Sequence, residues 1–338
     1  MTREIYEKGC SGHAFSEKIT VENNVLNNIY IYLTFDCPLR CYFCYAKGGR
    51  RKTVEMSLQE VAKITQDAID AGFKKITILG GEPFSYKFFK ELLLLYDRMN
   101  FGNTVLVLRT SFGFPIESSM MDLVCRVFDK ITVSIDGDEE NHDRIRGKGV
   151  YKQAIENIRE ALKRDNCEIG IAAVLSKEQK DGIEGKSVLE LYNSLKLDYL
   201  TIRPIKALGE MEGKPTETPY NVRYERNCID FPEFVQNCGL GHLLYVEPDG
   251  TVYPCYAVCN QCDKLGNLKT DTLNEIVTSD KFLDLANHGV DDDPICRNCD
   301  VRYFCGGECK LVGSVGENCK YKEALLKRIR EQLNSNIE

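Results

Sequence analysis

The sequence predicts an α/β protein built on a partial (β/α)6 barrel similar to a TIM barrel, with a small cysteine-rich region after it. Over residues 29–205, six candidate strands alternate with helices through short connections, which is typical of a parallel sheet covered by helices. Residues 238–320 lack this alternation and hold many cysteines instead. Six units are too few for a closed eight-stranded barrel, so we expect an open or partial one.

The predicted elements of the barrel follow one another with recognisable boundaries. The first strand, 29–35 (IYIYLTF), is expected to be buried. In the first helix, 57–72, Ser57 and Glu60 form a capping box and Gly72 ends the helix. The remaining strands are predicted at 75–79, 104–109, 130–135, 168–175 and 199–203, and the remaining helices at 86–99, 116–127, 151–164 and 185–196. In such sheets functional groups lie at the carboxyl ends of the strands.

Four further segments flank or follow the barrel. They are an N-terminal extension (1–28), a linker rich in Gly, Pro and charge (206–237), the cysteine-rich region (238–320) and a C-terminal segment (321–338) with a short amphipathic helix. Within the cysteine-rich region, the turn signal Pro248-Asp249-Gly250 between two apolar runs predicts a β-hairpin. We expect the C-terminal helix to pack on the rest of the protein.

Composition excludes several classes of protein. The 338 residues are 43% hydrophobic, enough to build a core, and the net charge of −7 argues against a nucleic-acid partner. No stretch reaches 18 apolar residues and residues 1–24 lack a signal-peptide pattern, so we expect a cytoplasmic protein without a membrane-spanning helix. Cytoplasmic thiols stay reduced, so 16 cysteines indicate metal binding. Cys125 and Cys167, in or beside apolar segments, are expected to be core residues instead.

The first cysteine group, Cys37, Cys41 and Cys44, has the spacing C-x3-C-x2-C directly after the first strand. Three thiolates on one short loop can hold three corners of a [4Fe–4S] cluster, which normally takes four Cys ligands. The next cysteine is Cys125, so one iron is expected to remain open to another ligand. A three-ligand zinc site is the competing interpretation.

With this pattern the chain resembles the radical S-adenosylmethionine (SAM) superfamily, in which C-x3-C-x2-C follows the first strand of a partial (β/α)6 barrel. An aromatic residue, here Phe43, precedes the last cysteine. The resemblance implies that SAM chelates the open iron through its amino and carboxylate groups. An electron from the cluster then cleaves SAM to methionine and a 5′-deoxyadenosyl radical, which abstracts hydrogen from the substrate. The resemblance also implies an electron donor such as flavodoxin or ferredoxin.

Further stretches match motifs of this family. Gly80-Gly81-Glu82-Pro83 resembles the GGEP motif, which implies that Glu82 grips the amino group of SAM. After the fourth strand, a run similar to the family's S-x-D-G…H-D…R pattern implies that polar groups there lie near SAM. The residues that the resemblance assigns to SAM binding here are Thr110, Ser134, Asp136 and Arg146. A turn with solvated charges is the alternative. Thr110-Ser111 departs from the commoner Thr-Asn-Gly, which weakens a role for Ser111, and Arg203 points to the same rim with an open role.

The second cysteine region resembles the SPASM domain, which has seven cysteines. The matching residues are Cys238, Gly250 and Cys255, then Cys296, Cys299, Cys305 and Cys309, then Cys319. Seven thiolates exceed one four-ligand site, so two clusters are needed. The resemblance implies that auxiliary cluster I takes Cys238, Cys255 and Cys309, and that auxiliary cluster II takes Cys296, Cys299, Cys305 and Cys319. The fourth ligand of cluster I stays open among Cys228, Cys259, Cys262, substrate and none. Two structural zinc ions are the alternative.

The resemblance favours modification of a ribosomal peptide or protein by crosslinking, thioether formation or epimerisation. The alternatives are dehydrogenation or cofactor biosynthesis on a small molecule, activation of a glycyl-radical enzyme, and a non-catalytic scaffold. Formylglycine formation is disfavoured because Tyr256 stands where sulfatase-maturing enzymes carry Asp. Only 36 residues precede Cys37, so a leader peptide would be bound by the barrel or by a separate protein. For epimerisation, Cys228 is a candidate hydrogen donor.

Overall fold

A single curved sheet organises the protein. The computed structural model describes residues 18–51, 54–206, 208–212, 222–225, 239–256, 264–300, 302–305 and 307. Within these residues the sheet has ten strands in the order β10-β9-β8-β1-β2-β3-β4-β5-β6-β7. The strands are β1 (Asn28–Tyr32), β2 (Lys75–Leu79), β3 (Val105–Thr110), β4 (Lys130–Ser134), β5 (Glu168–Leu175), β6 (Tyr199–Pro204), β7 (Val222–Glu225), β8 (Leu243–Val246), β9 (Thr251–Tyr253) and β10 (Gly266–Asn267).

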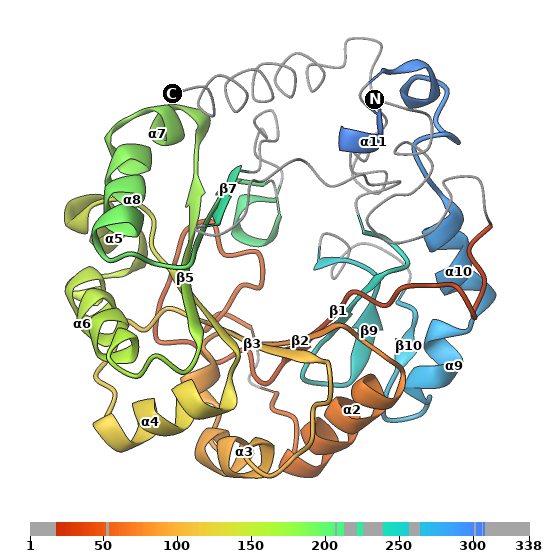
Figure 1. Cartoon of the computed structure of the whole chain (residues 1–338), viewed down its shortest axis with the longest axis horizontal. Helices are drawn as coiled ribbons and strands as arrows, with labels where there is room; N and C mark the ends of the chain where they lie inside the picture. The colour runs from red at the N-terminus through yellow and green to blue at the C-terminus, as the bar shows by residue number, and fades with distance from the viewer. Residues whose placement is uncertain are drawn as a thin grey trace.

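Helices cover the outer side of this sheet (Figure 1). The helices of the described part are α2 (Leu58–Asp70), α3 (Phe89–Tyr96), α4 (Ser118–Val127), α5 (Glu139–Arg146), α6 (Val150–Leu162), α7 (Lys177–Asp181), α8 (Ile183–Ser194), α9 (Leu273–Val277), α10 (Asp280–Asn287) and α11 (Arg302–Cys305), and α11 lies apart from the sheet. Short 3-10 helices are η1 (Pro83–Ser85), η2 (Gly209–Met211) and η4 (Cys296–Asn298). None of the helices in the described part is long and apolar enough to cross a membrane.

The barrel is open, as the sequence predicted. Strands β1 to β6 are parallel neighbours, but β1 pairs on its other side with β8 and not with β6. The capping box of Ser57 and Glu60 is present at the start of α2. The predicted hairpin is present as β8 and β9, and β8 lies parallel to β1, so part of the cysteine-rich region extends the barrel sheet.

Strand alternation divides the side chains between two faces. Ile29, Ile31 and Leu33 join the main hydrophobic core between sheet and helices. Tyr30 and Tyr32, from the same strand, belong to a second cluster on the inner face of the curved sheet. The inner face of β1 is therefore aromatic, while its aliphatic residues pack outward.

Three elements in and beside the barrel differ from the sequence-based expectation. Helix α5 was missed because its sequence, EENHDRIR, buries only His142 and Ile145 and shows no apolar stripe; Asp138 caps it by accepting from Asn141 N. Helix α7 is a five-residue helix after β5. Within the segment interpreted as a linker, β7 pairs antiparallel with the free edge of β6, which supplies the hydrogen bonds that so short a strand needs. The predicted C-terminal helix lies outside the described residues.

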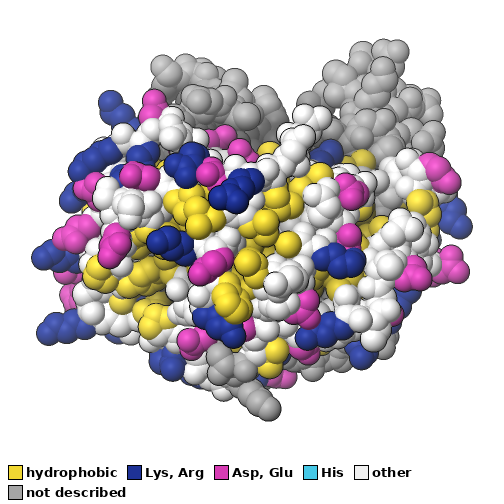
Figure 2. Space-filling view, turned by 90° about the horizontal axis from the view of Figure 1, so that it is seen from below, with side chains coloured by type: hydrophobic (Ala, Val, Ile, Leu, Met, Phe, Trp, Pro, Cys, Tyr) yellow, Lys and Arg dark blue, Asp and Glu magenta, His cyan; other side chains and the backbone are white. Residues whose placement is uncertain are grey.

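The molecular face seen from below mixes both signs of charge. In Figure 2, Lys and Arg side chains alternate with Asp and Glu side chains, and hydrophobic atoms lie between them. This face presents no continuous basic surface.

Candidate active site

Three cysteines lie on the loop that follows β1. Cys37 and Cys41 are buried and Cys44 is half-buried. The loop folds back on itself: Cys44 N donates to Cys41 O at 3.3 Å, and Arg40 Nη1 donates to Cys37 O at 2.5 Å. Burial raises the pKa of Cys37 to about 12, and the nearby Glu82 adds to this effect. No group of three or more His, Cys, Asp or Glu side chains in the described part of the chain is arranged to hold a single metal ion. Three thiols on one short loop are the donor set that an iron–sulfur cluster takes, so their chemistry fits such a cluster.

The Gly80-Gly81 pair lets the chain after β2 approach the cysteine loop closely. Gly81 N donates to Thr34 O and Glu82 N donates to Asp36 O, both at 2.8 Å. A Cβ atom on Gly81 would lie 2.2 Å from the backbone oxygen of Asp36, and one on Gly80 would lie 2.7 Å from that of Thr34. Backbone packing alone therefore requires glycine at both positions. Pro83 is buried and begins η1.

Glu82 is a buried carboxylate held by the end of β3. Its Oε1 accepts from Thr110 Oγ1 at 2.7 Å, and its Oε2 accepts from Ser111 N at 2.9 Å and Ser111 Oγ at 2.6 Å. Burial raises the pKa of Glu82 despite these donors. No cation forms an ion pair with it among the described residues. A bound ammonium group would supply the missing positive charge.

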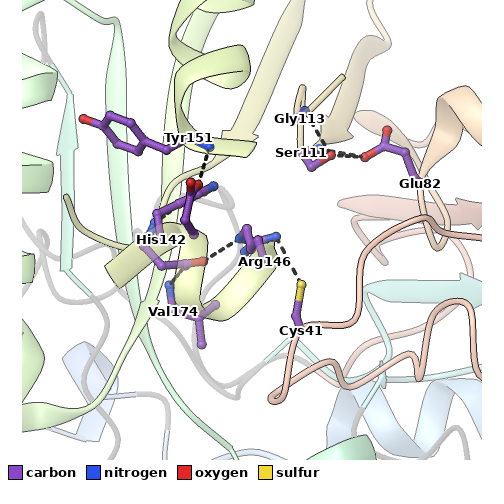
Figure 3. A network of polar contacts seen from close by, with 10 residues as sticks. Cys41, Glu82, Ser111, Gly113, His142, Arg146, Tyr151 and Val174 are labelled. Carbon is purple, nitrogen blue, oxygen red and sulfur yellow. Dashed lines mark hydrogen bonds and ion pairs between the residues drawn. The ribbon is translucent and has the colours of Figure 1, made fainter. Parts of the chain in front are cut away.

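A buried ion pair connects the end of β4 with the cysteine loop (Figure 3). Arg146, on α5, donates from Nε to Asp136 Oδ2 at 2.5 Å, and its Nη1 lies 3.8 Å from Cys41 Sγ. Asp136 Oδ1 accepts from Val174 N at 2.8 Å, so the pair is anchored to β5 as well. The Arg146 guanidinium also lies 5.8 Å from the ring of Phe43, which packs beside Cys41. These contacts place a fixed guanidinium next to the thiols.

Ser134 and His142 lie beside the Asp136–Arg146 ion pair. Ser134 ends β4 and is half-buried on the inner face, opposite Ala172 of β5. His142 accepts from Asp136 N through Nδ1 at 3.1 Å, so the backbone that carries Asp136 is fixed from the helix side. Burial lowers the pKa of His142 to about 4, and the ring is therefore neutral near pH 7.

The second cysteine region is described in part. Cys255 follows β9, and Cys296 and Cys299 lie at η4, where Cys299 N donates to Cys296 O at 2.8 Å. Cys305 ends α11, so Cys296, Cys299 and Cys305 belong to one compact segment. The predicted site residues outside the described part are Cys228, Cys238, Cys309 and Cys319, together with Cys259 and Cys262.

Aromatic and charged contacts join Cys255 and its hairpin to the barrel mouth. The Tyr256 ring lies 5.1 Å from that of Tyr45 and 5.7 Å from that of Tyr245. Glu247, nearly fully buried, pairs with Arg51 through two hydrogen bonds of 2.8 and 3.0 Å. The hairpin therefore touches the loop that carries the first three cysteines.

Sequence reasoning gave little weight to Ser111, which makes two of the three hydrogen bonds to Glu82. Its position directly after a strand end was the available signal. It assigned no role to Arg109, a polar residue in an apolar strand, and left that of Arg203 open; both lie on strands of the barrel.

Comparisons with known proteins agree with this geometry. Residues 31–181 match the profile of the radical SAM superfamily, and residues 238–300 match that of SPASM, described as an iron–sulfur cluster-binding domain. The chain is 25% identical to the sporulation killing factor maturation protein SkfB of Bacillus subtilis over 309 residues, 84% of this chain and 68% of that protein. It is 28% identical to a GTP 3′,8-cyclase of Helicobacter pylori over 57% of this chain and 59% of that protein.

Solved structures share the fold. Streptococcus suis SuiB bound to the precursor peptide SuiA has a TM-score of 0.67 at 14% identity, covering 85% of this chain and 72% of that one. Native anSMEcpe with bound AdoMet and Kp18Cys peptide has a TM-score of 0.69 at 18% identity, covering 91% of this chain and 98% of that one.

Proposed function

Because this chain is a radical SAM enzyme with a SPASM region, we propose that it modifies a ribosomal peptide or protein by radical chemistry. SkfB, which resembles this chain over 84% of this chain's length, is named as a maturation protein. SuiB, which shares the fold, is solved with a precursor peptide. Crosslinking, thioether formation and epimerisation are the reactions we propose for the substrate.

The observation that carries the proposal is the meeting of three loops at the carboxyl ends of β1, β2 and β4. They bring together the thiols of Cys37, Cys41 and Cys44, the buried carboxylate of Glu82 and the guanidinium of Arg146. We assign the thiols to a [4Fe–4S] cluster. When bound, this cluster supplies the electron that cleaves SAM to methionine and a hydrogen-abstracting 5′-deoxyadenosyl radical.

The protein's own groups orient SAM in this proposal. Glu82 accepts hydrogen bonds from the amino group, because it is buried, preorganised by Thr110 and Ser111, and lacks a cation of its own in the described residues. Arg146 and Ser134 contact the carboxylate and ribose of SAM. Asp136 acts through Arg146 by fixing its guanidinium. Phe43 packs beside Cys41 and covers the cluster-binding loop on that side. The backbone of Gly80, Gly81 and Pro83 holds the SAM-binding turn against the cysteine loop.

Two auxiliary iron–sulfur clusters in the SPASM region are part of the proposal. Cluster I takes Cys238, Cys255 and Cys309, and cluster II takes Cys296, Cys299, Cys305 and Cys319. A crosslinking reaction removes two electrons from its substrate: one leaves with the hydrogen atom that the 5′-deoxyadenosyl radical abstracts, and an auxiliary cluster, when bound, would accept the other. If the reaction is epimerisation, Cys228 is the proposed hydrogen donor. A flavodoxin or ferredoxin supplies electrons, and the barrel or a separate protein binds the leader.

The first experiment replaces Cys37, Cys41 and Cys44 with Ala. The reconstituted triple variant should form no 5′-deoxyadenosine under dithionite and should keep the iron of the auxiliary clusters. A variant with Cys125 replaced by Ala is the control, because Cys125 lies in the hydrophobic core away from the loop. Continued 5′-deoxyadenosine formation by the triple variant would contradict the assignment.

The second experiment identifies the reaction. The enzyme, SAM and reductant are incubated in deuterated water with candidate precursor peptides, and the peptides are analysed by mass spectrometry. Loss of two hydrogens means crosslinking or dehydrogenation, and gain of one deuteron at a Cα means epimerisation. The similarity to GTP 3′,8-cyclases favours small-molecule chemistry as the second candidate, which turnover of a metabolite without any peptide change would support.

A further inference from the structure

Two arginines project into the interior of the barrel from strands that are not neighbours. Arg109 lies on β3, where Leu106 and Leu108 pack into the outer core, so Arg109 faces inward. Arg203 lies on β6, where Leu200 and Ile202 face outward, so it also faces inward. Strands β4 and β5 separate β3 from β6 in the sheet, so the two side chains enter the interior of the curved sheet from different strands.

Electrostatics couples the two guanidinium groups. The charge of Arg109 is the largest cause of the lowered pKa of Arg203, and burial is the second. Tyr30 and Tyr245 act in the direction that raises the pKa of both arginines. The Arg109 guanidinium lies 5.5 Å from the Tyr30 ring. A third cation, Lys206, lies 5.2 Å from the ring of Tyr256 at the same end of β6.

Among the described residues, neither arginine has a counter-charge. In the described part of the chain, no Asp or Glu forms an ion pair with Arg109 or Arg203, whereas Arg146 and Arg51 each have a carboxylate partner. Arg109 Nε is buried and has no hydrogen-bond partner. Two like charges in a partly dehydrated interior, with a donor unsatisfied, oppose folding unless something binds them.

We propose that Arg109 and Arg203 form a binding site for an anionic group of the substrate, a carboxylate or a phosphate. The planar guanidinium fork matches the oxygens of both anions. The rings of Tyr30 and Tyr245, stacked at 4.2 Å, form an aromatic wall beside this site. The inference rests on the proposed function in one respect: the anion belongs to the molecule that the radical attacks. It is separate from SAM, which we assign to Glu82 and Arg146.

The test measures binding of small anions to the reconstituted holoenzyme by calorimetry, in the presence of SAM. N-acetylglutamate and inorganic phosphate are the two anionic probes, and N-acetylglutamine is the uncharged match of the first. We expect one anion or both to bind and N-acetylglutamine not to bind. Binding of N-acetylglutamate alone identifies a carboxylate, and binding of phosphate alone identifies a phosphorylated substrate. Absence of binding by both anions would overturn the proposal.

Variants connect the binding to the two arginines. Arg109→Gln and Arg203→Gln should weaken binding of the anion by about 10- to 100-fold, since each removes a charge-assisted hydrogen-bond donor. Arg203→Lys keeps the charge but loses the fork, so its loss should be smaller. Arg159→Gln, on the exposed face of α6, is the control and should bind like the wild type. Equal affinity in all variants would place the anion elsewhere.

Two further readouts separate this inference from its alternatives. SAM affinity and substrate-free SAM cleavage should be unchanged in Arg109→Gln and Arg203→Gln; if both fell with anion binding, the arginines would belong to the SAM site. Stability in urea should not fall in Arg109→Gln, because the substitution removes an unpaired buried charge; a fall would indicate a structural role. If the wild type binds the anion but never cleaves SAM, the proposed function fails while the anion site stands.

Discussion

Replacing Asp136 with Asn tests whether the ion pair with Arg146 is the structural anchor of this site. Each carboxylate oxygen of Asp136 accepts a hydrogen bond from a different donor: Oδ2 from Arg146 Nε and Oδ1 from Val174 N. An Asn side chain has one oxygen, so an NH2 group must face one of these two donors. Asp136 is fully buried and Arg146 nearly so, so the guanidinium would be left without a counter-charge. Breaking such a pair from one side costs about 3–5 kcal/mol.

The assay is urea unfolding of the reconstituted enzyme, followed by circular dichroism under anaerobic conditions. Asp97→Asn is the matched control, because Asp97 also accepts two hydrogen bonds from one arginine, Arg126, but on the surface. Exposed pairs contribute little, so this control should unfold like the wild type. Adding Arg146→Met to Asp136→Asn should recover part of the loss, since no unpaired charge remains. If Asp136→Asn were as stable as the control, the ion pair would not anchor the site.

The remaining predictions concern three residues of the same site. Gly81→Ala should abolish iron incorporation into the first cluster, because the new Cβ would lie 2.2 Å from a backbone oxygen of the cysteine loop. Gly102→Ala is the control: it introduces backbone strain at a φ of +56° but no atom within 4 Å of its Cβ, and iron analysis should show that the cluster is kept. Glu82→Gln should weaken SAM binding by about 1.5–3 kcal/mol in equilibrium dialysis, while the exposed control Glu91→Gln should not. Since burial lowers the pKa of His142 to about 4, the wild type should lose up to about 3 kcal/mol of stability as pH falls from 6.5 to 4, and His142→Asn should lose less over that range; equal pH profiles would argue against a buried neutral ring.

The barrel could be predicted from sequence because its strands are short apolar runs separated by capped helices. Ile76 and Ile78, for example, are buried on the side that the helices cover, as the run KITIL predicts. Helix α5 could not be predicted in this way, since polar capping and two buried residues hold it in place. The pairing of β8 with β1 was also hidden, because no local pattern specifies which sheet edge a hairpin will join.

Sequence motifs predicted the main residues of the candidate site but not the contacts between them. The sequence identified Glu82 and Arg146 as candidates, but not the partners that hold them, such as Ser111 for Glu82 and the Val174 amide for Asp136. These contacts join residues from different strands, so their spacing in the sequence carries no signal. The inward direction of Arg109 likewise follows only from the register of β3 within the sheet.

The pairing of Asn28–Ile31 with Leu243–Val246 also has a consequence for how the chain folds. During synthesis, β1 can pair with β2 early, but its other edge stays unsatisfied until the hairpin has emerged. Contacts between segments so distant in sequence form slowly, and an open strand edge invites pairing with another chain. We therefore expect β1 to be prone to aggregation in the nascent chain until the hairpin has paired with it.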